Sequence, residues 1–319
     1  MNPKWLKRLA ALAAAFACAT AHAFPDKAVR IIVPFPPGGA TDVVARSLGQ
    51  RLSALWKQPV VIENKAGAGG NIGADAVAKA EPDGYTLLLA SPAEVAINPF
   101  LYKSMTFDPE KDLVPVSKAA TAPLVLVVHP SVPAKTLPEL IAWLKSRKDG
   151  TPYASSGTGG PQHLAGESFR VMTGTNLIHV PYKGGAPAIT DLLGGQVSMF
   201  FAGLPPALPH IKAGKLRAIA VTTTQPSALI PGVPTVDSVV PGFDFENWQG
   251  VFAPRGTPDA IVQQIARDMA TVSDAALAEQ LARQGAAPAP SSPAEFAAFV
   301  QKERRKYSEL VKMSGAKVD

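Results

Sequence analysis

Short apolar runs alternate with stretches of helical periodicity along this chain, and this alternation restricts the fold more than any other feature. Continuous runs rich in Val, Ile, Leu and Ala are typical of strands that are buried on both faces of a parallel sheet. Strands that alternate with helices predict an α/β architecture with helices on both sheet faces. The runs that we predict to be strands are 29–33, 60–63, 85–90, 124–128, 153–155, 177–180, 197–202, 216–222 and 250–253.

Helix starts are marked by residues that can satisfy free amide groups in a first turn. Segments 136–139 and 292–295 place Thr or Ser three residues before Glu, which is the spacing of a capping box. The chain shows no internal repeat and no low-complexity linker, so a split into two contiguous domains is not indicated. A further helix is expected from Thr41 onward, because its apolar residues share one face: Val44, Leu48, Leu52 and Leu55.

The first 23 residues have the features of a cleaved secretory leader. Lys4, Lys7 and Arg8 precede a short apolar run, and Ala21-His22-Ala23 forms an A-x-A cleavage site. The apolar run is shorter than the roughly 20 residues of a membrane-spanning helix. We therefore expect export to the periplasm, cleavage before Phe24 and a soluble mature protein. Lipoprotein processing at Cys18 is the alternative, but the preceding residues lack the expected branched side chain.

Cysteine content and charge exclude several kinds of protein. Cys18 is the single cysteine of the chain, so the mature protein has no disulfide, no thiol nucleophile and no Cys-ligated metal. The leader holds three of the 31 Lys and Arg and none of the 25 Asp and Glu, so its removal lowers the net charge from +6 to +3. The basic run 302–306 is more typical of a solvated helix face than of a nucleic-acid site. No nucleic-acid partner is expected.

Four glycine-rich loops each follow a predicted strand and precede a predicted helix. A helix N-terminus offers unpaired amide groups and the positive end of the helix dipole, and glycine lets an anion approach that backbone closely. Any one of these loops is equally well explained as a tight turn. Together they predict a shared anion site built from Pro36-Pro37-Gly38-Gly39, Gly67-Ala68-Gly69-Gly70, Gly157-Thr158-Gly159-Gly160 and Gly184-Gly185.

Motifs of enzymes and metal sites are incomplete in this sequence. The series Gly67-x-Gly69-x-x-x-Gly73 places its third glycine one residue too late for a dinucleotide fingerprint, and no acidic residue follows at the required distance. The nucleophile elbow Gly-x-Ser-x-Gly does not occur. The histidines after the leader are isolated from one another, without metal-ligand spacing. No cofactor, metal or catalytic residue is expected.

Side chains at the borders of the glycine loops suit recognition better than catalysis. Small-molecule pockets combine apolar walls with a few placed donors, so Phe35 and Tyr182 are candidates for walls. Packing at the strand ends is the alternative role for both. His163 is the one histidine placed to reach a ligand, and an ordinary surface histidine is the alternative explanation. Asp42 is expected to cap the first helix and thereby hold its loop, rather than to contact an anion. The hydroxyl groups that border the loops belong to Ser91, Ser155, Ser156 and Thr158.

Five segments of the chain, taken together and in order, match one known family. They are 33–42 (VPFPPGGATD), 63–73 (ENKAGAGGNIG), 82–87 (PDGYTL), 153–159 (YASSGTG) and 179–185 (HVPYKGG). With them the chain closely resembles the Bug family (Bordetella uptake type), the periplasmic solute-binding receptors of tripartite tricarboxylate transporters. The similarity extends over essentially the whole mature chain, so it is more specific than any single motif.

This resemblance implies a type II periplasmic-binding-protein fold, in which two α/β lobes joined by two crossover strands close on a ligand. The crossovers are then expected near 121–125 and 247–252. The implied division has a signal peptide at 1–23, a discontinuous first lobe at 24–122 and 249–319, and a second lobe at 123–248.

The resemblance also implies where a ligand is held. In that family, backbone amides and bridging waters at the first glycine loop, here 35–41, hold the ligand carboxylate, and the loops at 155–160 and 182–185 add contacts from the second lobe. The ligand-binding residues expected on this basis are Phe35, Pro36, Gly38, Gly39, Thr41, Asp42, Ala68, Ser91, Ser155, Ser156, Thr158, Gly159, His163, Tyr182, Gly184 and Gly185.

The expected function is capture of a small, carboxylate-bearing or amino-acid-like metabolite and its delivery to the membrane components of a tripartite tricarboxylate-type transporter. A monomer is expected. The sequence does not choose among amino acids, nicotinate-type compounds and di- or tricarboxylates, and neutral ligands stay open because no arginine lies in the loops. Two alternatives are an exported α/β lyase or hydrolase that acts on a small anion, and a periplasmic partner of a membrane sensor kinase.

Overall fold

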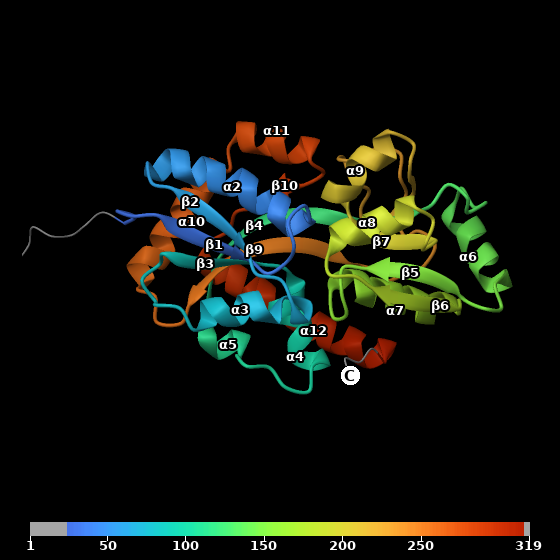
Figure 1. Cartoon of the computed structure of the whole chain (residues 1–319), viewed down its shortest axis with the longest axis horizontal. Coiled ribbons are helices and arrows are strands. Elements are labelled where there is room, and N and C mark those ends of the chain that lie inside the picture. The colour runs from blue at the N-terminus through green and yellow to red at the C-terminus, as the bar shows by residue number, and fades with distance from the viewer. Residues whose placement is uncertain (1–23, 316–319) are drawn as a thin grey trace, which may run out of the picture.

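The computed structural model describes residues 24–315, which form two α/β lobes side by side (Figure 1). The predicted leader, its cleavage site and Cys18 lie outside the described residues. No helix in the described part combines the length and the apolar character that a membrane span requires. The expected α/β fold with two lobes is therefore confirmed.

The sheet of the first lobe is built on parallel strands near the N-terminus. Strand β1 (Val29–Val33) pairs in parallel with β2 (Val60–Asn64) and with β3 (Thr86–Ala90). Strand β9 (Glu246–Pro254) follows β3 in antiparallel orientation and pairs with the first part of β4 (Leu113–Val128). The short strand β10 (Ala287–Pro288) also pairs with β4.

The sheet of the second lobe continues from the last residues of β4. These residues pair in antiparallel orientation with β7 (Met199–Gly203) and with β8 (Arg217–Val221). Strand β5 (Thr151–Ser155) lies between β7 and β6 (Leu177–Pro181) and is parallel to both.

Strands β4 and β9 connect the two sheets. Strand β4 pairs with β9 as far as Pro123 and with β7 from Leu124 onward. At the start of β9, the Phe245 amide donates a hydrogen bond to the Thr222 carbonyl, just after β8. This arrangement agrees with the expected crossovers. The division at 122/123 and 248/249 stays a prediction.

Helices cover both faces of each sheet. On the first sheet, α2 (Ala40–Trp56), α10 (Asp259–Val272) and α11 (Ala275–Arg283) share one apolar core, and α3 (Asn71–Ala78) and α12 (Pro293–Ser314) pack on the opposite face. On the second sheet, α8 (Gly185–Leu193) and α9 (Leu204–Lys212) cover one face, while α6 (Leu137–Ser146) and α7 (Pro161–Thr173) cover the other. The short segments are η1 (Ala68–Gly70), η2 (Ala93–Ile97), α4 (Asn98–Leu101) and α5 (Pro109–Asp112).

Helix α12 joins the two lobes along one side of the molecule (Figure 1). It packs on β4 and η2 of the first lobe and on α7 of the second. Trp248 of β9 meets Phe296 edge to face, with ring centroids 5.7 Å apart. Buried residues of both lobes, including Phe245 and Tyr307, belong to the same continuous core. The crossover strands are therefore anchored to a helix that contacts both lobes.

Two sequence expectations need correction. Strand β4 begins at Leu113 rather than 124, because Pro115, Lys118 and Pro123 interrupt its apolar pattern while its backbone still pairs with β9 through two register shifts. The capping box at α12 is complete, but the one expected at α6 is half formed. There the Glu139 carboxylate accepts the amide of Lys135 instead of that of Thr136.

Candidate functional site

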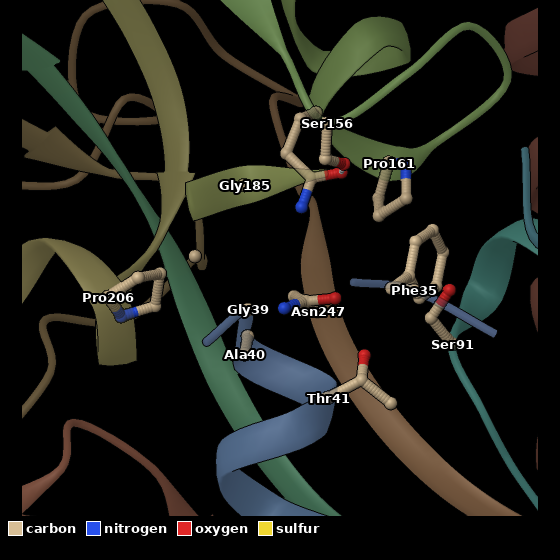
Figure 2. Close-up of a pocket in the computed structure, with 12 residues that line it drawn as sticks. Phe35, Gly39, Ala40, Thr41, Ser91, Ser156, Pro161, Gly185, Pro206 and Asn247 are labelled. Atoms are coloured by element: carbon tan, nitrogen blue, oxygen red, sulfur yellow. Dashed lines mark hydrogen bonds between the residues drawn. The ribbon is translucent and has the colours of Figure 1, made fainter. Parts of the chain in front are cut away.

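A small pocket lies between the lobes, where loops from both sheets meet (Figure 2). Its volume of about 30 Å³ is room for about two or three water molecules, which is close to the size of one carboxylate group. Asn247 of β9 lies at its centre, with Gly39, Ala40 and Thr41 on one side and Ser156 on the other. The lining residues are Phe35, Gly39, Ala40, Thr41, Ser91, Ser156, Pro161, Gln162, Gly185, Gly203, Pro206 and Asn247.

Four helices begin at this pocket, and each has glycine as its N-cap. The N-caps of α2, α7, α8 and α9 are Gly39, Gly160, Gly184 and Gly203, and no side chain caps any of them. By contrast, helices α6, α11 and α12 are capped by the side chains of Thr136, Asp274 and Ser292. The first amide groups of a helix need an acceptor when its N-cap supplies none. The pocket therefore gathers four positive helix ends. Those of α2, α7 and α8 offer free amides to an anion, whereas α9 offers fewer, because its second and third residues, Pro205 and Pro206, have no N–H.

The residues that line the pocket carry no formal charge in the described part of the chain. Polar character comes from the hydroxyl groups of Thr41, Ser91 and Ser156 and from the side-chain amides of Gln162 and Asn247. The Ser156 hydroxyl donates to Gln162 Oε1 at 2.8 Å, which leaves the NH₂ group of Gln162 as a donor. An anion in this pocket meets donors and no competing carboxylate.

Asp42 holds the first glycine loop from behind. Its carboxylate accepts hydrogen bonds from the Gly38 amide at 2.9 Å, from the Arg46 guanidinium at 2.9 and 3.0 Å, and from Asn64 Nδ2 at 3.0 Å. Burial alone would raise the pKa of Asp42, but the hydrogen bonds from Arg46, Gly38 and Asn64 outweigh it and lower the pKa below its ordinary value. The expected loop-holding role is thus observed. The expected capping of first-turn amides is wrong, because Gly38 precedes the helix.

A second, larger cavity adjoins the pocket and shares Phe35 and Ser156 with it. Its volume is about 300 Å³. Lys183 is the one charged side chain among its described lining residues, and it forms no ion pair within residues 24–315. The other residues around this cavity are Pro36, Ala66, Gly67, Ala68, Gly69, Gly70, Gly157 and Tyr182.

Loops from the two lobes touch each other beside these cavities. A β-carbon added to Gly184 would lie 2.9 Å from Pro36 Cδ, and one added to Gly69 would lie 3.0 Å from the Thr158 carbonyl oxygen. The first distance is too short for a real side chain, and the second is tighter than nearly all real side chains show. Glycine at these two positions, each with positive φ, therefore allows close contact of Gly184 with the Pro36 ring and of Gly69 with the Thr158 backbone.

His163 lies behind the loop at 155–160 and lines neither cavity. Its Nδ1 accepts a hydrogen bond from the Gly159 amide at 3.3 Å, and its ring stacks on His179 with centroids 4.0 Å apart. His179 Nε2 in turn lies 2.6 Å from the Ser155 hydroxyl. Burial lowers the pKa of His163 to about 4 and, with the adjacent His163, that of His179 to about 3. Both rings are neutral at pH 7, which lets His163 accept the Gly159 amide.

The predicted site residues thus fall into three groups. Phe35, Gly39, Thr41, Ser91, Ser156 and Gly185 line the pocket, while Pro36, Ala68 and Tyr182 line the adjoining cavity. The other predicted residues lie outside both linings: Gly38, Asp42, Ser155, Thr158, Gly159, His163 and Gly184.

Sequence reasoning missed half of the residues that line the pocket. Gly203 follows a predicted strand and precedes two prolines, so it carries the signal of a helix start and was open to detection. Asn247 is the second residue of β9, without a neighbouring glycine motif, and no local signal marks it. The lining residues that the sequence did not identify are Ala40, Pro161, Gln162, Gly203, Pro206 and Asn247.

Comparison with known proteins gives one consistent family. Residues 44–316 match the sequence model of the tripartite tricarboxylate transporter family receptor. The chain is 40% identical to Protein BugT of Bordetella pertussis, over 94% of this chain and 93% of that protein.

Solved structures of the same kind superpose closely on the whole fold. A structure of a periplasmic transporter is 42% identical with a TM-score of 0.89, and the match covers 93% of this chain and all of that one. R. palustris Rpa4515 with adipate is 36% identical with a TM-score of 0.90, over 92% and 100% of the two chains. MatC from Rhodopseudomonas palustris with bound malate is 31% identical with a TM-score of 0.85, over 90% and 100%.

The role of Asp42 is tested by Asp42→Ala. We expect the free energy of unfolding at pH 7 to fall by about 2 kcal/mol, because Gly38, Arg46 and Asn64 lose the buried carboxylate that accepts their hydrogen bonds. The lowered pKa means that Asp42 stabilises the fold above its ordinary pKa of 3.8 and loses this effect as the pH falls below it, so wild type and variant should converge in acid. Urea denaturation at several pH values measures both effects.

The control is Glu279→Ala, which removes an exposed carboxylate paired with Arg283 and should cost less than about 0.5 kcal/mol. Equal stability of Asp42→Ala and wild type at pH 7 would show that Asp42 does not hold the loop.

Proposed function

This chain belongs to the receptors of the tripartite tricarboxylate transporter family, and we propose that it captures a small dicarboxylate between its lobes and delivers it to the membrane components of such a transporter. Proteins of this family are solute-binding receptors rather than enzymes, and they bind small carboxylates. The nature of the ligand, the residues that hold it and the partner components form the proposal.

The observation that carries the proposal is the set of four glycine-capped helix starts around one uncharged pocket. Helix N-termini bind carboxylates through backbone amides, and no side-chain cation is needed. The volume of about 30 Å³ admits one carboxylate group and little more. The remainder of the ligand then extends past Phe35 and Ser156 into the adjoining cavity.

The adjoining cavity favours a second anionic group on the ligand. Lys183 lines it without an ion-pair partner in the described chain, so a distal carboxylate has a cation within reach. Two similar receptors were solved with dicarboxylates, Rpa4515 with adipate and MatC with malate. A dicarboxylate therefore fits both cavities.

An amino acid fits the same site less well. Its ammonium group needs a carboxylate or several carbonyl acceptors, and no Asp or Glu lines either cavity among residues 24–315. Asp42, the acid behind the first glycine loop, is engaged by Arg46 and Gly38. We therefore place dicarboxylates before amino acids in the proposal.

The cellular setting completes the proposal. Receptors of this family are periplasmic binding proteins, and the leader at residues 1–23, with cleavage before Phe24, is the proposed route of export. The receptor acts as a monomer that presents its loaded form to the membrane components. A role as the partner of a sensor kinase is the alternative, and it requires the same capture of ligand.

Titration calorimetry against adipate, malate, succinate, glutamate and nicotinate tests the proposed ligand class. We expect one dicarboxylate to bind with a Kd in the micromolar range or below, with no turnover. In Gly39→Val, affinity should fall at least about tenfold, because a β-branched side chain fills the carboxylate pocket. The backbone of Gly39 has φ −77° and little around it, so the fold should lose only about 1 kcal/mol.

Gly39→Ala is the graded control and should weaken binding less than Gly39→Val does. Unchanged dicarboxylate affinity in Gly39→Val would place the carboxylate outside this pocket. If glutamate were the one compound of this set to bind, the proposed ligand class would be amino acids rather than simple dicarboxylates.

The distal group is tested by Lys183→Met with pairs of ligands that differ in one carboxylate. We expect the variant to lose about fivefold in affinity for adipate and none for hexanoate, because a partly exposed charge pair contributes about 1 kcal/mol. Lys183→Arg should keep the preference for adipate. Lys65→Met removes an exposed lysine that does not line the cavity and serves as the control. Equal losses for adipate and hexanoate would exclude a charge contact at Lys183.

A further inference from the structure

Glu94 is a wholly buried acid directly behind the wall of the pocket. It belongs to η2, and none of its surface is exposed. Its Oε2 accepts hydrogen bonds from the Ser91 amide at 2.9 Å and from the Ser91 hydroxyl at 3.0 Å. Ser91 itself lines the pocket. A single residue therefore separates this carboxyl group from the proposed ligand.

The other oxygen of Glu94 is enclosed without a partner. Oε1 accepts no hydrogen bond from any described residue. It lies against Gly70, where an added β-carbon would overlap the carboxyl group. Gly70 belongs to the glycine loop that borders the adjoining cavity. The carboxyl group is thus sealed between two walls of the ligand site.

No cation compensates a negative charge at this position. Segment η2 packs against α12, α4, η1, α5 and β3, and α4, η1 and β3 carry no titratable side chain. Arg304 of α12 reaches η2, but its guanidinium binds the Val95 carbonyl and Glu110 of α5. Around Arg304 on α12, the neighbouring titratable residues are Glu303, Arg305, Lys306 and Tyr307, and around Glu110 on α5 they are Lys111 and Asp112.

The charged form of Glu94 is therefore unfavourable in this structure. Removing a carboxylate from water without a counter-ion strongly disfavours its ionised state. The hydrogen bonds from Ser91 lower the pKa and offset the effect of burial only in part. Burial raises the pKa of Glu94 to about 8. At pH 7 the Glu94 carboxyl group is largely neutral, and it ionises as the pH rises through about 8.

Ionisation of Glu94 weakens the binding of an anionic ligand in two ways. An ionised Glu94 draws the Ser91 hydroxyl hydrogen inward, so Ser91 turns only lone pairs toward the ligand. A neutral Glu94 releases that hydrogen, and Ser91 can donate it to a carboxylate. A ligand anion in contact with Ser91 also lies within about 6 Å of Glu94, a separation at which like charges disfavour each other.

We propose that Glu94 is a positioning residue that couples ligand capture to a proton, so that the site binds its carboxylate ligand with Glu94 neutral and releases it more readily once Glu94 ionises. The proposal rests on the proposed function, because it requires an anionic ligand at Ser91. The ligand then raises the proton affinity of Glu94, and Glu94 in its neutral state raises the affinity for the ligand by the same factor.

The pH range from 7 to 9 isolates this effect. Adipate and malate are fully ionised throughout it. His163 and His179, with pKa values lowered to about 4 and about 3, are neutral throughout. Tyr182 borders the adjoining cavity and has its pKa raised by burial to about 12, so it also keeps one state.

The test compares the ratio of Kd at pH 9 to Kd at pH 7 in wild type and in Glu94→Gln, with adipate or malate as the probe, whichever binds more tightly. For a group that ionises near pH 8, the wild-type ratio should be about ten. In Glu94→Gln, which is neutral at both pH values, the ratio should be near one.

Calorimetry at pH 8 in buffers of different ionisation enthalpy should also show proton uptake by wild type and none by the variant.

Glu110→Gln is the matched control, because this carboxylate lies beside η2, pairs with Arg304 and is half exposed. This variant should keep the wild-type ratio of Kd at pH 9 to Kd at pH 7.

Carbon-13 NMR of the Glu94 carboxyl group in the ligand-free protein measures its titration without any ligand, and titration near pH 8 supports the proposal.

Titration near the ordinary Glu pKa of 4.5, or equal ratios in wild type and Glu94→Gln, would overturn the coupling and leave the proposed function intact. Absence of binding by every dicarboxylate at every pH would defeat the proposed function, and the coupling with it.

Discussion

The uncapped amide groups at the starts of α2, α7 and α8, which meet beside the proline-rich start of α9, are the constraint on which the rest of this structure depends. Side chains of Thr136, Asp274 and Ser292 cap helices elsewhere in the fold, whereas glycine occupies the N-cap of α2, α7, α8 and α9. Unpaired amides are costly when they are taken out of water. Because these four helix starts meet in one pocket without a charged lining residue, closing the lobes favours an anion between them.

The rest of the fold brings these helix starts together. Parallel strands place the first residues of α2, α7 and α8 at the edge of each sheet that faces the other lobe, and β4 and β9 fix the two sheets side by side. Helix α12 joins both lobes through one continuous core. Behind the pocket, Asp42 and His163 each accept an amide of a glycine loop, from Gly38 and Gly159. These supports let backbone, rather than side-chain charge, form the binding surface.

Most of the fold follows from local sequence signals. Apolar runs mark the strands because β1, β3 and β5 are buried on both faces, and glycine loops mark the starts of α2, α7 and α8 because those starts need backbone freedom. The first half of β4 escaped detection, since Pro115, Lys118 and Pro123 break its pattern while β9 supplies the pairing. Half of the residues that line the pocket were not predicted from the sequence, for a similar reason. Asn247 and Gln162 reach it only through the packing of one lobe on the other, which no local pattern encodes.

The central claim is that backbone amides at converging helix starts hold the ligand carboxylate. A crystal structure of the protein with a bound dicarboxylate tests it most directly. The account predicts carboxylate oxygens within about 3 Å of amide nitrogens in the segment from Gly39 to Thr41 and at Gly185, with Asn247 beside them. A carboxylate paired instead with a side-chain cation, with these amides bound to water, would contradict the account.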